Sequence, residues 1–126
     1  MSGTEFLKNI SESEKNLFLL EAELAAFEDV HSKTTSASLQ KKLSKIIRAI
    51  EKETENLAKL KIEGFNLINT LDDFNQRCVL TYHFICNMPF SDITYTMNYS
   101  QRHIMRIYEK ACNNVNEHFA KQKHSI

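Results

Sequence analysis

Four side chains that can hydrogen-bond to nucleic acid are crowded into six residues of the C-terminal half. Gln101, Arg102, His103 and Arg106 supply amide, guanidinium and imidazole N–H donors. Arg102 and Arg106 are four residues apart, so a helix would present both on one side. A guanidinium donates paired hydrogen bonds to a guanine edge or binds a phosphate, whereas a glutamine amide suits adenine. These residue types at this spacing predict contacts with double-stranded DNA.

A helix from residue 101 to about residue 119 would position these donors. Its apolar residues recur with helical spacing and predict a buried back face: Ile104, Ile107, Tyr108, Ala111 and Val115. Ser100 is a favoured N-cap, and the free amides beside it suit a phosphate. Asn98 tolerates the left-handed backbone of a tight turn. Lys110, further along, adds salt-dependent attraction to a phosphate backbone.

Two further helices are expected before this one. A helix over 74–86, capped by Asp72 or Asp73, should be broken at Pro89, which lacks an amide donor. Ser91 is then predicted to cap a short helix over 92–97 and to meet a phosphate. The order of helix, break, short helix, tight turn and longer helix is the layout of a helix-turn-helix unit.

The N-terminal part is predicted to form two long helices with heptad spacing, separated by a Ser/Thr-rich connection at 31–38. Their apolar seams contain two polar positions, Ser13 and Glu53. Helices this long must pair with each other as a hairpin, with another subunit, or with both. The residues expected to support a homodimer are Leu17, Leu20, Leu24, Leu43, Ile46, Ile50, Leu57 and Leu60.

The sequence therefore predicts an all-α protein. Two glycines and one proline in 126 residues favour long helices over a many-turned β fold. We expect a helical hairpin or coiled-coil arm over residues 1–71, followed by a helix-turn-helix unit over residues 72–126.

Composition and charge exclude several classes of protein. The chain has no apolar run long enough for a membrane span and no visible secretory signal, and an odd number of cysteines fits a reducing cytoplasm. Net charge is zero, but residues 75–126 hold six Lys/Arg against three Asp/Glu, a difference of +3. Cys78, Cys86 and Cys112 lack metal-ligand spacing and fall on the apolar sides of their helices. No phosphate loop, nucleophile elbow, cofactor site or other enzymatic motif is recognisable.

Several segments resemble a known group of proteins. NQRCVL (75–80), FI (84–85), FSDI (90–93) and YSQRHIMRI (99–107) are similar to the fourth region of bacterial sigma factors. The closer similarity is to phage- and prophage-encoded regulators that include the ArpU and RinA proteins, in which a segment like 99–106 opens the recognition helix. Asn87 and Asn98 stand where that group usually has glycine, and Thr94 where it has a small residue. The resemblance implies a DNA-binding transcription regulator, often of late or packaging genes.

We therefore expect a DNA-binding transcriptional regulator of a phage or mobile element, in the cytoplasm of a bacterial host. It would act as a homodimer and contact DNA through Ser91, Ser100, Gln101, Arg102, His103, Arg106 and Lys110. Two alternatives remain open at this point. One is a module that binds a protein such as RNA polymerase, a repressor or a defence nuclease. The other is a packaging component like a small terminase subunit.

Overall fold

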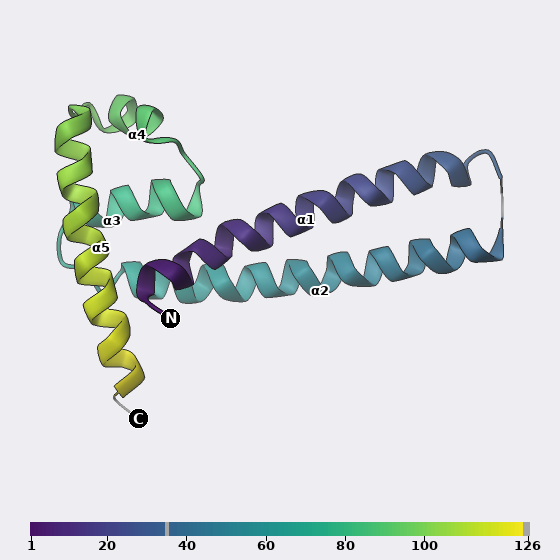
Figure 1. Cartoon of the computed structure of the whole chain (residues 1–126), viewed down its shortest axis with the longest axis horizontal. Helices are drawn as coiled ribbons and strands as arrows, with labels where there is room; N and C mark the ends of the chain where they lie inside the picture. Colours follow the sequence, from purple (N-terminus) through teal and green to yellow (C-terminus); the bar gives the residue numbers. More distant parts are fainter. Residues whose placement is uncertain (35, 125–126) are drawn as a thin grey trace. The chain divides into compact units, whose positions relative to one another are not determined.

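The computed structural model describes residues 1–34 and 36–124, with side chains up to residue 122. Within these residues all regular structure is helical, which confirms the predicted all-α class (Figure 1). The elements in chain order are α1 (Gly3–His31), α2 (Ala37–Ile68), α3 (Phe74–Leu80), the π-helical turn η1 (Thr81–Ile85), α4 (Phe90–Met97) and α5 (Gln101–His124).

The chain divides into two compact units. One comprises Met1–Ser11 together with the chain from Leu60 onward, and the other is Glu12–Lys59. The sequence-based division at residue 71 differs from this one, because both ends of the expected arm belong to the same unit as α3, α4 and α5. Leu7 and Ile10 near the start of α1, and Leu67 and Ile68 at the end of α2, are buried there.

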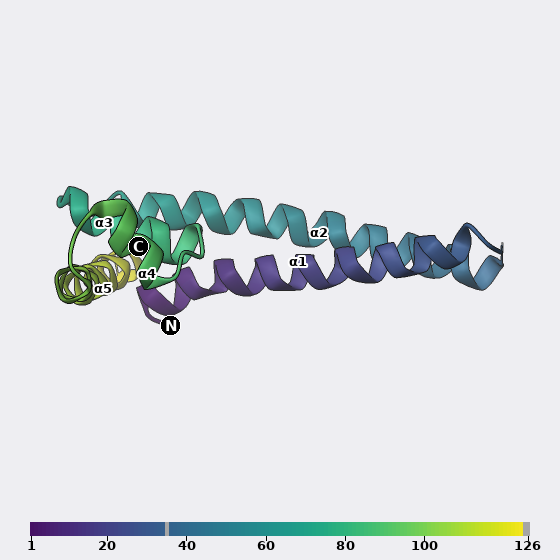
Figure 2. The ribbon, with the colours of Figure 1, turned by 90° about the horizontal axis from the view of Figure 1, so that it is seen from above.

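The unit Glu12–Lys59, hereafter the hairpin unit, consists of two antiparallel helical segments that run side by side (Figures 1 and 2). The Ser13 hydroxyl donates a 2.6 Å hydrogen bond to Glu53 Oε1, and Lys42 Nζ lies 3.3 Å from Glu23 Oε1. The two polar positions of the heptad seams thus meet each other and set the register. The expected dimerisation residues of this unit share the seam with Ser13 and Glu53, and all are buried or half-buried.

The Ser13–Glu53 pair can be tested by a double-mutant cycle. Ser13→Ala is expected to lower the free energy of unfolding by about 1–3 kcal/mol, because the half-buried carboxylate of Glu53 loses its short hydrogen bond and keeps only the 3.5 Å one from Asn56 Nδ2. Ser13→Ala combined with Glu53→Leu should restore wild-type stability or exceed it, because an apolar pair continues the seam. Urea denaturation of the four proteins measures both effects. Independent, additive losses from the two substitutions would contradict the pairing.

The other unit, Met1–Ser11 together with the chain from Leu60 onward, contains a small core beneath α5. Val79 of α3, Ile93 of α4 and Ile104 of α5 are fully buried against one another. Half-buried apolar residues surround this trio: Tyr82, Met88, Phe90, Met97, Ile107 and Tyr108. Because each of the three helices contributes one member, this core fixes how α4 and the first turns of α5 are held.

The start of α1 docks on the second half of α5. The Thr4 N–H donates a 2.9 Å hydrogen bond to Asn116 Oδ1, and the rings of Phe6 and Phe119 stack with centroids 5.6 Å apart. A Cβ on Gly3 would lie only 2.8 Å from the Val115 carbonyl oxygen. Glycine at this position therefore allows the two backbones to approach closely.

The third predicted helix, 74–86, changes its winding before it ends. Asp73 caps it, accepting a 2.9 Å hydrogen bond from the Gln76 N–H, and η1 follows α3 directly. The Cys86 N–H donates to the Thr81 carbonyl, five residues back, at 3.0 Å. The extra residue in this turn rotates the end of the helix, so Cys86 is exposed and its predicted apolar placement was wrong. Cys78 and Cys112 are half-buried, as their spacing indicated.

His83 in η1 lies inside an aromatic cluster. Its ring centroid is 4.7 Å from that of Phe84, 4.6 Å from that of Phe90 and 5.1 Å from that of Tyr108. Nδ1 is buried without a hydrogen-bond partner among the described residues. Burial lowers the pKa of His83 from its ordinary value of 6.5, a hydrogen bond with the Met88 backbone opposes this, and the charge of Lys8 adds to it.

The lowered pKa of His83 predicts acid sensitivity. The unfolded chain, whose imidazole has its ordinary pKa of 6.5, takes up the proton first as the pH falls. Stability is therefore complete above that pH and declines as the pH falls towards the lower pKa of the folded state. The difference in unfolding free energy between wild type and His83→Gln should shrink from about pH 7 to about pH 5, measured by urea denaturation. A pH-independent difference would contradict this assignment.

Candidate nucleic-acid interface

A left-handed residue and a capping serine join α4 to α5. Asn98 has φ 57° and ψ 42°, and Ser100 Oγ accepts a 3.1 Å hydrogen bond from the His103 N–H. Both features confirm predictions made from the sequence. Asn87, the other asparagine at an expected glycine position, also has a positive φ of 54°. Asparagine adopts this backbone more readily than most other non-glycine residues, which explains why two asparagines serve at these turns.

The predicted start of α4, at residue 92, was wrong, because the helix begins two residues earlier. The helix begins at Phe90 with Pro89 at its N-cap, and no side chain caps it. The Pro89 carbonyl accepts hydrogen bonds from the N–H groups of Asp92 and Ile93 at 3.0 and 3.2 Å. The proline therefore starts the helix itself, and Ser91 is an exposed residue of the first turn rather than its cap. The suggested phosphate contact of Ser91 stays a prediction.

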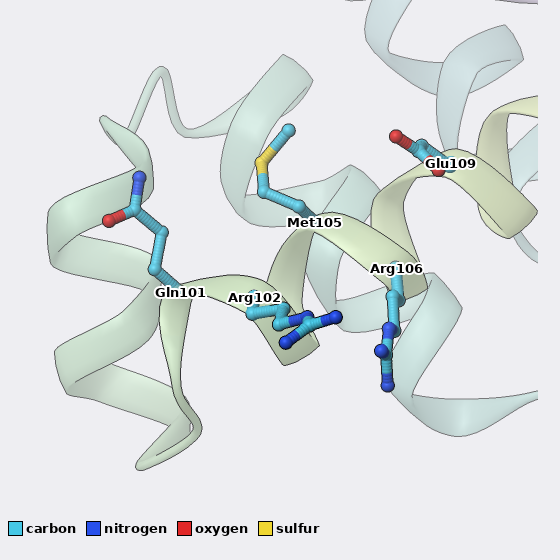
Figure 3. Close-up of a pocket in the computed structure, with 5 residues that line it drawn as sticks. All are labelled: Gln101, Arg102, Met105, Arg106 and Glu109. Atoms are coloured by element: carbon cyan, nitrogen blue, oxygen red, sulfur yellow. The ribbon is translucent and has the colours of Figure 1, made fainter.

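The first three turns of α5 expose the polar side chains that the sequence singled out. Gln101, Arg102, His103, Arg106 and Lys110 are all exposed, and Ile104 between them is fully buried. Figure 3 shows the guanidinium groups of Arg102 and Arg106 extending to one side of α5, while Gln101 and Met105 extend to another. Gln101, Arg102 and Arg106 line a shallow hollow with Met105 and Glu109.

A second hollow, of about 350 Å³, lies between α5 and the start of α3. His103, Arg106 and Lys110 line its α5 side, and Asp73, Asn75 and Gln76 line its α3 side. Three nitrogen-bearing side chains thus face two amides across a space that is open to solvent. Asp73 is the only carboxylate that lines this hollow, and one of its oxygens already accepts from the Gln76 N–H. Such a donor-rich surface suits a phosphate.

Several residues of this surface were not predicted from the sequence. Asn75 Nδ2 donates a 3.3 Å hydrogen bond to the Tyr99 hydroxyl, whose ring packs edge-on against His103 with centroids 4.6 Å apart. Asn114 Nδ2 donates to Gln76 Oε1 at 2.9 Å. These contacts fix the start of α3 against α5. The polar pair Asn75–Gln76 at a helix start was visible in the sequence, but its distance to α5 was not.

The cations of this surface are free of ion pairs. The ion pairs seen in the described part of the chain include Lys15–Glu12, Lys33–Asp29, Lys42–Glu23 and Lys59–Glu55, which lie within the hairpin unit. None involves Arg102, Arg106 or Lys110. Unpaired cations can accept an external anion without first giving up a protein partner. The positive charges of Arg102, Arg106 and Lys110 are therefore available on the exposed side of α5.

The described residues contain neither a metal-binding cluster nor a membrane-spanning helix. No group of three or more His, Cys, Asp or Glu side chains is arranged to hold a metal ion there. No helix in that range is sufficiently long and apolar to cross a bilayer.

Tyr108 lies beside Cys112 and keeps its proton. Burial first, and then the charge and the hydrogen bond of Cys112, raise the pKa of Tyr108 to about 12.

These features define an all-α protein with an exposed, donor-rich helix start beside a small packed core. The chain belongs to the DUF1492 family of proteins of unknown function. The model of that family matches residues 32–116, which is more than half of the 126 residues. The match includes α2, α3, η1, α4 and most of α5, so all of the exposed polar residues of α5 named above fall inside it. No curated protein and no solved structure matches the chain.

Proposed function

We propose that this protein is a DNA-binding transcriptional regulator of a phage or mobile element, with α4 and α5 acting as a helix-turn-helix. The observation that carries the proposal is the exposed, unpaired set Gln101, Arg102 and Arg106 on the first turns of a helix whose opposite side is buried. A helix with this distribution fits the major groove, where guanidinium and amide groups read base edges. The resemblance of 99–107 to phage regulators supports the phage origin.

The hollow between α3 and α5 supports a specific orientation on DNA. His103 and Lys110 lie towards α3, whereas Met105 and Glu109 line the other hollow of α5. A sugar–phosphate backbone is attracted to the first side and repelled by the carboxylate of Glu109 on the second. We therefore propose that the groove floor meets Gln101, Arg102 and Arg106, and that one strand's phosphates pass the hollow beside Asn75 and His103.

The test is binding of the full chain to a labelled duplex that contains the sequence upstream of its own gene. Fluorescence anisotropy at several salt concentrations should show affinity that falls steeply as salt rises, because each neutralised phosphate releases counterions. An unrelated duplex of equal length should bind at least about a thousandfold more weakly. Equal, salt-insensitive affinity for both duplexes would reject the proposal.

A second candidate, a protein-interaction module, is favoured by one observation. Tyr95 on α4 is 89% exposed and Phe74 at the start of α3 is 69% exposed. Large exposed aromatic side chains are typical of protein-binding surfaces. In this alternative the C-terminal unit holds a protein such as RNA polymerase. Capture of purified RNA polymerase after nuclease treatment, and its loss in Tyr95→Ser, would support this function over DNA binding.

A further inference from the structure

One side of α1 in the hairpin unit carries apolar residues that α2 does not cover. We call this side the outer stripe; its members are exposed apolar residues, namely Phe18, Leu19, Ala22, Ala25, Ala26 and Val30. At 100° per residue they lie on the side of α1 away from the seam leucines. Phe18 is 70% exposed, Leu19 65% and Val30 46%. Because large apolar side chains exposed together mark interaction surfaces, the outer stripe is a candidate for binding a partner.

The outer stripe lies in a strongly acidic segment. Residues 12–31 hold six Asp/Glu and one Lys, a net charge of −5. Glu21 and Glu28, seven residues apart, are exposed along one edge of the stripe, and neither takes part in an ion pair with another described residue. These two carboxylates can therefore receive the cations of a partner without first losing a cation of their own chain.

The charge of α1 disfavours a second copy of this chain as the partner. The outer stripes of two copies can face each other about a twofold axis, but that contact sets two segments of charge −5 against each other. The basic segment of the chain, residues 37–59 with six Lys/Arg and three Glu, already lies along the other side of α1 within the hairpin (Figures 1 and 2). These charges favour a different molecule as the partner.

A bilayer surface also fits these charges poorly. Helices that lie in a bilayer interface carry Lys and Arg on their polar sides, because the lipid surface is anionic. The outer stripe is flanked by carboxylates instead, and Lys15 is the only lysine or arginine between residues 12 and 31. A polypeptide that brings its own cations matches the stripe better.

The length and surroundings of the stripe favour a helix as its partner. From Phe18 to Val30 the stripe spans about 18 Å, or roughly three turns of helix. An extended segment would leave its backbone N–H and C=O groups without partners against apolar side chains, because α1 offers no sheet edge. A helix satisfies these groups internally and can present an apolar side of its own.

We propose that the outer stripe of α1 binds a basic amphipathic helix of another protein. The apolar side of that helix covers Phe18, Leu19 and Val30, and its flanking Lys and Arg side chains meet Glu21 and Glu28. The stripe belongs to the hairpin unit, whereas α3, α4 and α5 belong to the other unit. The proposal is therefore independent of DNA binding through α5, and its tests contain no nucleic acid.

The first test measures binding of the full chain to labelled synthetic peptides by fluorescence anisotropy. The probe is a helical peptide of about 18 residues of Leu and Lys, with its leucines on one side. One control peptide has Glu in place of Lys, and the other is a scrambled Leu/Lys peptide of equal charge. The wild type should bind the probe with a Kd of about 10 µM or lower, and each control at least about tenfold more weakly. No binding of the probe, or equal binding of the scrambled peptide, would overturn the proposal.

Substitutions locate this binding on the outer stripe. Phe18→Ser/Leu19→Ser should weaken binding of the probe at least about tenfold, since apolar area leaves the interface while the charge stays the same. Ile62→Ser is the matched control and should leave the affinity unchanged, because Ile62 is 62% exposed and lies outside the hairpin unit. Circular dichroism should show that each variant keeps its helices. A double variant that binds the probe as tightly as Ile62→Ser does would overturn the proposal.

Charge reversal tests the class of partner. Glu21→Lys/Glu28→Lys should bind the acidic peptide at least about fivefold more tightly than the wild type does, and the basic probe more weakly. A preference that stays the same in this variant would contradict a basic partner.

Two further measurements distinguish the other possible occupants of the stripe. In sedimentation velocity, the wild type and Phe18→Ser/Leu19→Ser should have the same oligomeric state. Neither protein should float with vesicles of phosphatidylcholine, with or without phosphatidylserine. Weaker self-association in the double variant would identify a second copy as the occupant, and vesicle binding that the double variant loses would identify a bilayer. Either result would overturn the proposal.

Discussion

Replacing Arg102 and Arg106 together by alanine is expected to lower affinity for the upstream DNA by roughly a hundredfold or more. A base-contacting arginine typically contributes about 1–3 kcal/mol, and both guanidinium groups extend to the same side of α5 without an ion pair (Figure 3). Fluorescence anisotropy on the specific and the unrelated duplex separates two roles. Loss of a base contact should fall mainly on the specific duplex, whereas loss of a phosphate contact should weaken both and reduce the salt slope by about one.

The matched control for this experiment is Lys33→Ala/Arg48→Ala, which removes two exposed cations from the hairpin unit and leaves α5 unchanged. This control changes the net charge by the same amount as Arg102→Ala/Arg106→Ala does. It therefore measures how much of the loss in DNA affinity comes from nonspecific electrostatic attraction. The control should change affinity less than about threefold. Equal losses in the two double variants would show that α5 does not read DNA.

Ile104→Ala is expected to destabilise the unit that carries α5 by about 2–5 kcal/mol. Ile104 is fully buried against Val79 and Ile93, so its truncation leaves a cavity at the point where three helices meet. Because Ile104 lies between the exposed donors of α5, DNA affinity should fall as well. Urea denaturation followed by circular dichroism measures the stability. Ile62→Ala, at a residue 62% exposed, should change it by less than about 0.5 kcal/mol.

The two measurements on Ile104→Ala, its stability and its affinity for DNA, distinguish a residue that holds α5 in place from a residue that contacts DNA. At a temperature where the variant is still folded, its affinity for DNA should be reduced less than that of Arg102→Ala/Arg106→Ala. A variant that is as stable as the wild type would show that this core does not hold α5. In that event the account of how the donors are positioned would be wrong.

Local signals in the sequence were sufficient to predict the conformation of the turn between α4 and α5. Asn98 and Ser100 act through hydrogen bonds and backbone angles within a few residues of themselves, so their types and order predict their conformations. Asp73 as the cap of α3 is a prediction of the same kind. Heptad spacing likewise indicated two long helices with one seam each, and both were found.

Contacts between distant residues could not be predicted in this way. Ser13 and Glu53 each appeared as an interruption of its own seam, but only the register of the hairpin brings their side chains to 2.6 Å. Asn116 caps α1 through Thr4, a residue 112 positions away, and no local pattern signals that. The π-turn at Thr81–Ile85 has no local signature either, so the exposure of Cys86 was missed. For the same reason Asn75 and Tyr99 were not assigned to the interface.

The central claim, that α5 reads a DNA sequence, is tested most directly by selection of duplexes from a random library by the full-length chain. The wild-type chain should enrich one sequence, and Arg102→Ala/Arg106→Ala should lose that enrichment. Recovery of unenriched, random duplexes by the wild-type protein at moderate salt would contradict it.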